Sequence, residues 1–404
     1  MARPLDPRLL RHARAARGYV VLTAGLGLVT AGLALPLATL APSTAFADTG
    51  AEHHRAAPGA VFVQLNAASG NAIAAYARAG DGTLTAAGTV PTGGLGGTAV
   101  GAPLDALASQ GSLGLDERHR VLVAVNAGSD TITSFSVDGT RLRRRSVVAS
   151  SGQFPVSVAV RGDLAFVLNA GGHGSVSGFR LDDGRLSPIA GTTRDLGLGN
   201  TAVPTFITAP SQVGFTPDGH TLVVATKANN TLLTFHVDGA GHLAAAPVVT
   251  PSAGKVPFSF VTDPSGGIHV TNAGDGTQTS YRVGAGGGLV ALGTSAPTGG
   301  AALCWNVRVG GTVYGANAGS ATLSAWQVTP GGATTLTAPV AATTGAGPID
   351  LATSADGRFL YAQDAVAGAL SSYTVGADGS LAALQTVSGL PAFSKGGMEG
   401  LAAF

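Results

Sequence analysis

The chain has 404 residues, of which 45% are hydrophobic and 11% charged, and its formal net charge is +1. High apolar content with almost no net charge excludes a disordered chain, and the balanced charge excludes a polybasic nucleic-acid binder. The 61 glycines follow no three-residue period, which excludes collagen. One cysteine, Cys304, excludes a disulfide scaffold. This composition is typical of many short strands joined by tight turns.

The N-terminal segment has the pattern of a signal peptide. Five arginines lie between positions 3 and 17, an apolar stretch follows from Tyr19 to Leu40, and the small-x-small sequence Ala45–Ala47 closes the segment. The alternative is an uncleaved membrane anchor, because the apolar run is about long enough to span a bilayer. We expect cleavage after residue 47, a polar lead-in over 48–58, and a secreted protein, extracellular or in the cell envelope, without a membrane anchor.

A repeat runs through the rest of the chain. Each unit reads as an apolar strand, a short loop opened by Asn, Thr or Asp, and an alternating strand closed by an aromatic residue, with Asp-Gly turns between units. The closing aromatics are Tyr76, Phe135, Phe179, Phe235, Tyr281, Trp326 and Tyr373, with spacings of 59, 44, 56, 46, 45 and 47 residues. A four-stranded unit of this length is a propeller blade. The repeat predicts an all-β fold over 59–404, a seven-bladed β-propeller with four antiparallel strands per blade.

The two ends of the repeat predict how the ring closes. The first unit begins at Gly59 directly with its second strand, and residues 397–404 form an apolar segment with no unit of its own. We expect the C-terminal strand to complete the first blade, which removes open sheet edges.

Two runs resemble a known family. Pro210–Gly219 and Pro348–Tyr361 are similar to segments of the lactonase-family seven-bladed propellers, which include propeller-type 6-phosphogluconolactonases and the fungal carboxymuconate cyclase. The resemblance implies a lactone hydrolase or a cyclase-like enzyme. It also implies a functional His, Arg and Glu at the positions of Ser211, Phe258 and Ala273, and this chain retains none of the three.

Two long insertions point to one face of the propeller. The two large spacings correspond to residues 91–109 and 188–209, both in connections from the outer strand of one blade to the inner strand of the next. Long loops on a rigid scaffold often carry function. The alternative is that the glycine-rich segment Thr92–Ala102 is only a tolerated insertion.

One column of positions lies at the start of the inner strands, where we expect it to face the channel mouth. These polar side chains either bind a small polyhydroxylated or carbonyl-bearing ligand, or satisfy strand ends and channel waters. The column is Ser112, Ser157, Gln212, Ser259, Asn306, Asp350 and Gly400.

The other candidate residues have the following predicted roles. Asp350 is the candidate base for activating water, assisted by His173 in the loop of the third blade. Lys227 is a candidate cation for a carboxylate or an oxyanion. Trp305 forms an aromatic wall or packs between blades, and Glu399 is either a partner of Asp350 or an exposed terminal residue. Cys304 is interpreted as a small buried residue.

Two functions remain open at this stage. The first is hydrolysis or isomerisation of a small lactone or related carbonyl compound at the channel mouth. The second is a non-catalytic propeller that binds an extracellular metabolite, glycan or protein. In both cases we expect a small-molecule ligand or substrate. We expect no metal, no cofactor and no nucleic-acid partner, and we expect the protein to be a monomer.

Overall fold

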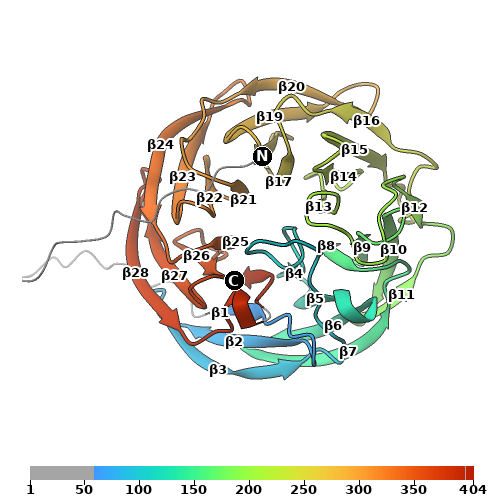
Figure 1. Ribbon diagram of the computed structural model, residues 1–404, viewed down its shortest axis with the longest axis horizontal. Coiled ribbons are helices and arrows are strands. Elements are labelled where there is room, and N and C mark those ends of the chain that lie inside the picture. The colour runs from blue at the N-terminus through green and yellow to red at the C-terminus, as the bar shows by residue number, and fades with distance from the viewer. Residues whose placement is uncertain (1–58, 396) are drawn as a thin grey trace, which may run out of the picture. The chain divides into compact units, whose positions relative to one another are not determined.

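A computed structural model describes residues 59–395 and 397–404, which all belong to one compact unit, His54–Phe404. Their strands form seven antiparallel sheets, arranged as blades around a central axis (Figure 1). The prediction of an all-β, seven-bladed propeller is therefore confirmed. The expected signal peptide, 1–47, and the lead-in, 48–58, lie outside the described residues. Within these residues no helix has the length and hydropathy needed to cross a membrane.

The first four blades follow one another around the ring, and the strands of each blade run in order from the axis to the rim. Blade 1 contains β29 (Leu401–Ala403), β1 (Gly59–Gln64), β2 (Ala72–Arg78) and β3 (Leu84–Pro91). Blade 2 contains β4 (Leu113–Asp116), β5 (Val121–Asn126), β6 (Thr131–Asp138) and β7 (Arg141–Ala149), with the short 3-10 helix η1 (Ala127–Ser129). Blade 3 contains β8 (Pro155–Arg161), β9 (Leu164–Asn169), β10 (Ser175–Asp182) and β11 (Arg185–Pro188), and β12 (Arg194–Asp195) also pairs with β10. Blade 4 contains β13 (Pro210–Phe215), β14 (Thr221–Thr226), β15 (Thr231–His236) and β16 (Val248–Pro251).

The last three blades have the same order. Blade 5 contains β17 (Pro257–Thr262), β18 (Ile268–Asn272), β19 (Thr277–Val283) and β20 (Leu289–Thr294). Blade 6 contains β21 (Leu303–Val309), β22 (Thr312–Asn317), β23 (Thr322–Val328) and β24 (Thr334–Thr343). Blade 7 contains β25 (Pro348–Thr353), β26 (Phe359–Asp364), β27 (Ala369–Val375) and β28 (Leu381–Ser388), and the 3-10 helix η2 (Phe393–Lys395) follows it.

The C-terminal strand closes the ring as predicted. β29 pairs antiparallel with β1, with Phe62 opposite Ala402. Among the described residues, the first strand is therefore the second strand of blade 1 and the last is its first strand. This pairing leaves β1 without an open edge.

The repeated aromatics form the packing between blades. All seven lie in the third strand of their blades, and none is more than 6% exposed. Large rings at one recurrent position fill the space between neighbouring twisted sheets. They belong to the core and not to a ligand-stacking surface, as the sequence predicts.

A repeated asparagine fixes the loops on the face that carries the insertions. Asn272, the last residue of β18, donates hydrogen bonds to Thr277 Oγ1 at 3.0 Å and Thr279 Oγ1 at 2.9 Å. Gly254, in the preceding connection, lies so close that a Cβ there would be 2.1 Å from the Asn272 side chain. Asn126, Asn169 and Asn317 make the same pair of bonds in blades 2, 3 and 6. The asparagines end the second strands, and their bonds hold the turn into the third strands.

Candidate functional site

The two long insertions meet over the channel mouth. Residues 91–109 connect β3 to β4 and residues 188–209 connect β11 to β13, as the spacings predict. The amide of Val100 donates to the carbonyl of Pro204 at 2.9 Å, and the amide of Phe206 donates back to the carbonyl of Val100 at 2.9 Å. These bonds join the insertions into one cover.

Residues 105–110, which we call the plug, fill the mouth of the channel and reach across it. The indole Nε1 of Trp305 donates to the carbonyl of Ser109 at 2.8 Å. The side-chain amide of Gln110 donates to the carbonyl of Asn306 and accepts from the amide of Asn306, both at 2.9 Å. The plug leads into blade 2, whereas Trp305 and Asn306 belong to blade 6. The mouth is therefore filled by protein and is not an open polar channel.

Three ionisable side chains lie buried beneath this cover. The Nζ of Lys227, in the loop between β14 and β15, donates to the plug carbonyl of Ala108 at 2.5 Å. The carboxylate of Glu399 accepts from the amide of Leu107 at 2.9 Å. Lys227 is 2% exposed, Glu399 1% and Asp105 0%. Charges held this far from water need partners within the protein.

The three groups influence one another. Burial raises the pKa of Asp105, and the neighbouring Glu399 and Lys227 side chains oppose that shift. Burial and the Asp105 charge raise the pKa of Glu399 well above its usual range, which favours its neutral form. Burial lowers the pKa of Lys227 to about 8, and the nearby Asp105 charge opposes that shift. The ammonium of Lys227 and the carboxylate of Asp105 therefore compensate each other's charge.

The predicted column of polar residues is buried, apart from half-buried Gln212, and joins consecutive inner strands. A side chain at this position forms a hydrogen bond with the backbone of the next blade and so links the two blades. The bonds are those of Ser157 with the amide of Val213 at 3.2 Å, of Gln212 with both backbone groups of Phe260 at 3.0 and 2.6 Å, and of Ser259 with the carbonyl of Cys304 at 2.5 Å. These contacts match the alternative in which the column satisfies strand ends, and a ligand-binding role for these residues stays a prediction.

Asp350 occupies the same position in blade 7. Its carboxylate accepts from the amides of Leu351 at 3.1 Å and Leu401 at 3.0 Å, and it is 4% exposed. Burial raises the pKa of Asp350 to about 7, although the bond from Leu401 opposes the shift. The predicted base thus joins blade 7 to the strand that closes blade 1.

A hydrogen bond and close packing fix the remaining members of the column. The amide of Asn306 donates from Nδ2 to the carbonyl of His269 at 2.9 Å. Gly400 has φ +87°, and a Cβ there would lie 2.4 Å from the Oγ of Ser112. Glycine is therefore required at position 400 for both conformation and space.

An apolar pocket of about 210 Å³ opens beside the plug, between blades 4, 5 and 6. The insertions and the inner strands both contribute to its walls. The main lining side chains are Leu104, Phe206, Lys227, Phe258, Cys304 and Trp305. Ala273 also lines it, so two positions that the family resemblance assigns to charged residues are apolar here. The volume lies below the range of drug-sized sites, so the pocket suits a small ligand.

Aromatic rings surround the one amine of this pocket. The Nζ of Lys227 lies 5.1 Å from the ring centroids of both Phe206 and Phe258. Phe258 meets Trp305 edge to face, with 4.9 Å between the centroids. Trp305 therefore lines the pocket and also packs between blades, so the two alternatives given by the sequence do not exclude each other.

The two other reactive side chains behave differently. His173 is exposed in the loop between β9 and β10, and its side chain makes no hydrogen bond or ion pair with the described residues. It is not brought to buried Asp350, so their joint catalytic role remains a prediction. Cys304 is a buried free thiol, and burial raises its pKa, which makes a nucleophilic thiolate unfavourable.

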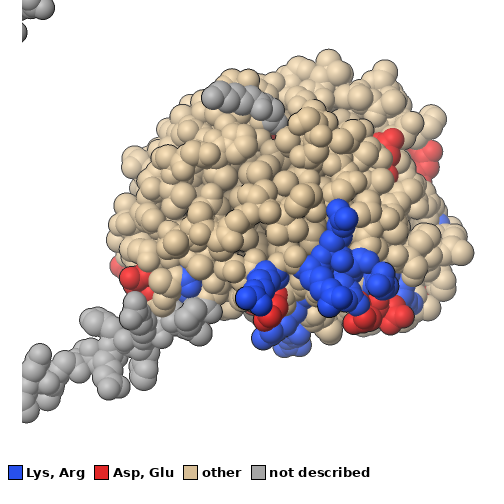
Figure 2. Space-filling view, turned by 90° about the horizontal axis from the view of Figure 1, so that it is seen from below, with Lys and Arg blue, Asp and Glu red and all other residues tan. Residues whose placement is uncertain are grey.

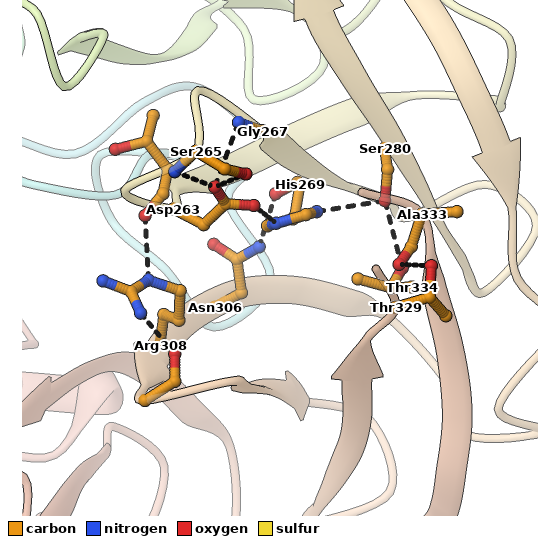
Figure 3. Close-up of polar contacts among 12 residues, drawn as sticks. Asp263, Ser265, Gly267, His269, Ser280, Asn306, Arg308, Thr329, Ala333 and Thr334 are labelled. Carbon is orange, nitrogen blue, oxygen red and sulfur yellow. Dashed lines mark hydrogen bonds and ion pairs between the residues drawn. The ribbon is translucent and has the colours of Figure 1, made fainter. Parts of the chain in front are cut away.

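A buried Asp–His–Ser chain lies in blade 5, away from the pocket lining (Figure 3). The Nε2 of His269 contacts Asp263 Oδ2 at 3.0 Å, and its Nδ1 contacts Ser280 Oγ at 3.0 Å. His269 lies in β18, the second strand of its blade, with 0% exposure. The Oγ of Ser280 also meets Thr334 Oγ1 at 3.2 Å. The chain is a structural network, since no substrate could reach the serine.

No group of three His, Cys, Asp or Glu side chains suited to a metal ion occurs among the described residues.

Comparison with known proteins agrees with this architecture. Residues 112–307 match the family described as lactonase, seven-bladed β-propeller. Over these residues, just under half of the chain, the sequence is that of a lactonase-family propeller. None of the curated proteins matches its sequence.

Solved structures share the fold of this lactonase-family propeller. A protein from Lactobacillus plantarum is 19% identical, with a TM-score of 0.66 over 86% of this chain and 100% of that one. A candidate 6-phosphogluconolactonase from Bacteroides uniformis is 20% identical, with a TM-score of 0.63 over 83% and 98%. A periplasmic gluconolactonase from Pseudomonas aeruginosa is 19% identical, with a TM-score of 0.62 over 83% and 98%. At these identities the likeness establishes the fold.

Sequence reasoning found part of the pocket of this lactonase-family propeller. Lys227 and Trp305 were among the predicted ligand-binding residues, and both line it. Phe206 and Asp105 were missed, because both belong to insertions that follow no repeat. The available signal was indirect, namely that both insertions were predicted on the same face.

Proposed function

We propose that this lactonase-family propeller binds a small apolar lactone in the pocket beside the plug and hydrolyses it. The observation that carries the proposal is the buried amine of Lys227 between the rings of Phe206 and Phe258. An apolar, aromatic wall with one hydrogen-bond donor matches the chemistry of a lactone, which has an apolar ring and one carbonyl.

Lys227 supplies the electrostatic part of the reaction. An ammonium has three donors, and one is used on the carbonyl of Ala108. Another can meet the carbonyl oxygen of the lactone and stabilise the oxyanion that forms when water attacks. In a water-excluded site, one such donor is worth about 10²–10³ in rate. Water oxygen bonds to the acyl carbon, the bond from that carbon to the ring oxygen breaks, and the product is one hydroxycarboxylate, with one proton released.

The lining favours an apolar lactone over a sugar lactone or a phosphorylated one. Lys227 and Cys304 are the described lining residues with ionisable side chains, and neither Arg nor His is among them. The hydroxyl groups of an aldonolactone would lose their bonds to water without replacement, at about 1–3 kcal/mol each. This revises the polyhydroxylated ligand that the sequence suggested for the mouth.

Binding without turnover is the second candidate. It is favoured by the absence of a carboxylate from the described pocket lining, since hydrolysis by general base catalysis needs a group within reach of the attacking water. The predicted base, Asp350, lies at the seam between blades 7 and 1.

Export is part of the proposal as well. It is supported by the signal-like pattern of residues 1–47 and by the periplasmic location given for the gluconolactonase of P. aeruginosa. Detection of a mature protein that begins near residue 48 in the culture medium or cell envelope would test it.

Tryptophan fluorescence and proton release together test the two candidates. Trp305 lines the pocket, whereas Trp326 is buried in β23 away from the lining, so ligand entry should change the emission of Trp305 alone. Titration with small γ- and δ-lactones should give a saturable change that Trp305→Phe abolishes. Proton release above the spontaneous rate identifies an enzyme, and a saturable change without release identifies a binding protein. No saturable change with any lactone would reject both.

A further inference from the structure

A groove of about 740 Å³ runs along the rim between blades 1 and 2, on the opposite side of β2 and β6 from the central channel. Its walls are β3 and β7, which lie side by side at the edge of the ring (Figure 1). On the β3 side the lining is small and hydroxylated, with Gly88 and Thr89, and on the β7 side it contains Arg141 and Arg143.

Positive charge gathers at this groove. β7 carries four arginines in nine residues, at positions 141, 143, 144 and 145. Figure 2 views the side of the ring where β3 and β7 lie, and shows Lys and Arg gathered in one region with some Asp and Glu beside them, while most of the visible surface carries no charge. Arg145 pairs with Asp183. Arg141, Arg143 and Arg144 are exposed and form no ion pair with the described residues.

The acidic residue in the groove already has a partner. Asp138 Oδ1 lies 3.9 Å from the guanidinium of Arg120, and its side chain is 82% exposed. The groove lining therefore carries two arginines against one aspartate. The alternative is that these arginines form a solvated edge that discourages strand addition.

Another rim groove of the same propeller serves as an internal reference. The groove between blades 6 and 7 has about 480 Å³ and is lined by residues such as Thr343, Ser371 and Gln385, with no charged residue among its described lining. Grooves at the rim are thus a property of the fold, whereas paired arginines are a property of the groove between blades 1 and 2.

We propose that the groove between β3 and β7 binds a linear anionic polysaccharide. Arg141 and Arg143 are two residues apart on β7, so their side chains lie on one face of the strand and can meet successive acidic groups of a chain. Hydroxyls of Thr89, Ser136 and Thr140 line the same groove and suit the hydroxyl groups of sugars. No aromatic residue is among its described lining residues, so it offers no platform for stacking the bases of a single-stranded nucleic acid.

Binding of defined polymers to the folded protein tests this inference. Heparin provides sulfate groups and polygalacturonate provides carboxylates, with neutral dextran and a single-stranded oligonucleotide as comparisons. We expect heparin or polygalacturonate to bind at low salt, with affinity that falls steeply as salt rises, and dextran not to bind. Whichever acidic polymer binds more tightly identifies the acidic group.

Two variants make the assignment specific. Arg141→Gln with Arg143→Gln should weaken binding about tenfold and reduce its salt dependence, because two counter-charges are lost. Arg282→Gln removes an exposed arginine of β19 in blade 5 and should leave affinity unchanged. An unchanged melting temperature would show that the double variant is folded. No acidic polymer bound, equal weakening by Arg282→Gln, or tighter binding of the oligonucleotide than of both polysaccharides would each overturn the inference.

Discussion

The carboxylate of Asp350 in β25 accepts a hydrogen bond from the amide of Leu401 in β29 at 3.0 Å. This contact joins the last blade to the strand that completes the first. β29 has only three residues, so each bond across this seam matters for closing the ring. Asp350 is thus placed to stabilise the fold, in the same way that the hydrogen bonds of Gln212 link blade 4 to blade 5.

The stability of this seam should depend on pH. The pKa of Asp350 rises from 3.8 to about 7 on folding, so the folded state holds the proton more tightly. The contribution of Asp350 is therefore fully present below about pH 4 and is lost as the pH rises to about 7. Asp350→Asn cannot titrate. In urea unfolding, the free energy of the wild type should fall relative to this variant between pH 4 and 7.5, and parallel curves would contradict the shift.

The plug should depend on Gln110. Its side chain makes two bonds to Asn306 across the channel, and Gln110→Ala removes both, at about 1–3 kcal/mol. We expect faster amide hydrogen exchange at Leu107 and Ala108. Gln212→Ala removes an equivalent pair of bonds between blades 4 and 5 and is the matched control. It should lower stability to a similar extent without faster exchange in the plug, and equal exchange in both variants would argue against a fastened plug.

Hydrolysis should require the charged form of Lys227. Burial lowers the pKa of Lys227 to about 8, so the ammonium dominates below that pH and the neutral amine above it. Because the proposed oxyanion contact needs the ammonium, the rate above spontaneous hydrolysis should fall as the pH rises through about 8. A rate that instead increases through pH 8 would mean that the neutral amine acts as a base.

The Asp–His–Ser chain of blade 5 should contribute only to stability. Ser280→Ala removes the hydroxyl that contacts His269 and leaves a buried ring nitrogen without that partner. We expect a loss of about 1–3 kcal/mol in the free energy of unfolding and no change in lactone turnover. A folded Ser280→Ala protein that has lost turnover would assign the chain a role in catalysis.

The sequence predicts the fold far better than the pocket, for a physical reason. The packing between blades repeats, so Phe135, Tyr281 and the other aromatics mark the third strand of every blade with the same signal. The pocket does not repeat, because it depends on insertions that cross the ring and meet distant blades. The bond between Lys227 and Ala108 joins residues 119 positions apart, and nothing local in either segment indicates it.

The inner column shows the same limit in another form. The structure places its positions at or near the start of the inner strands, as the sequence predicts. Whether a polar side chain there faces a ligand or a neighbouring strand depends on what fills the mouth of the channel. The plug fills it, so Ser157 and Ser259 bond to adjacent blades. A loop of nearly twenty residues with little periodicity gave no indication of that outcome.

The most direct test compares two variants in one assay of lactone hydrolysis. Lys227→Met keeps the length of the side chain and removes the amine from the pocket, whereas Asp350→Asn changes the predicted base at the seam. Proton release should be measured with an apolar lactone at pH 7, after a thermal melt has shown that both variants are folded. We predict a rate about 10²–10³ lower for Lys227→Met and a rate near that of the wild type for Asp350→Asn. Turnover that survives in Lys227→Met and disappears in Asp350→Asn would contradict the proposed site and return catalysis to the inner column.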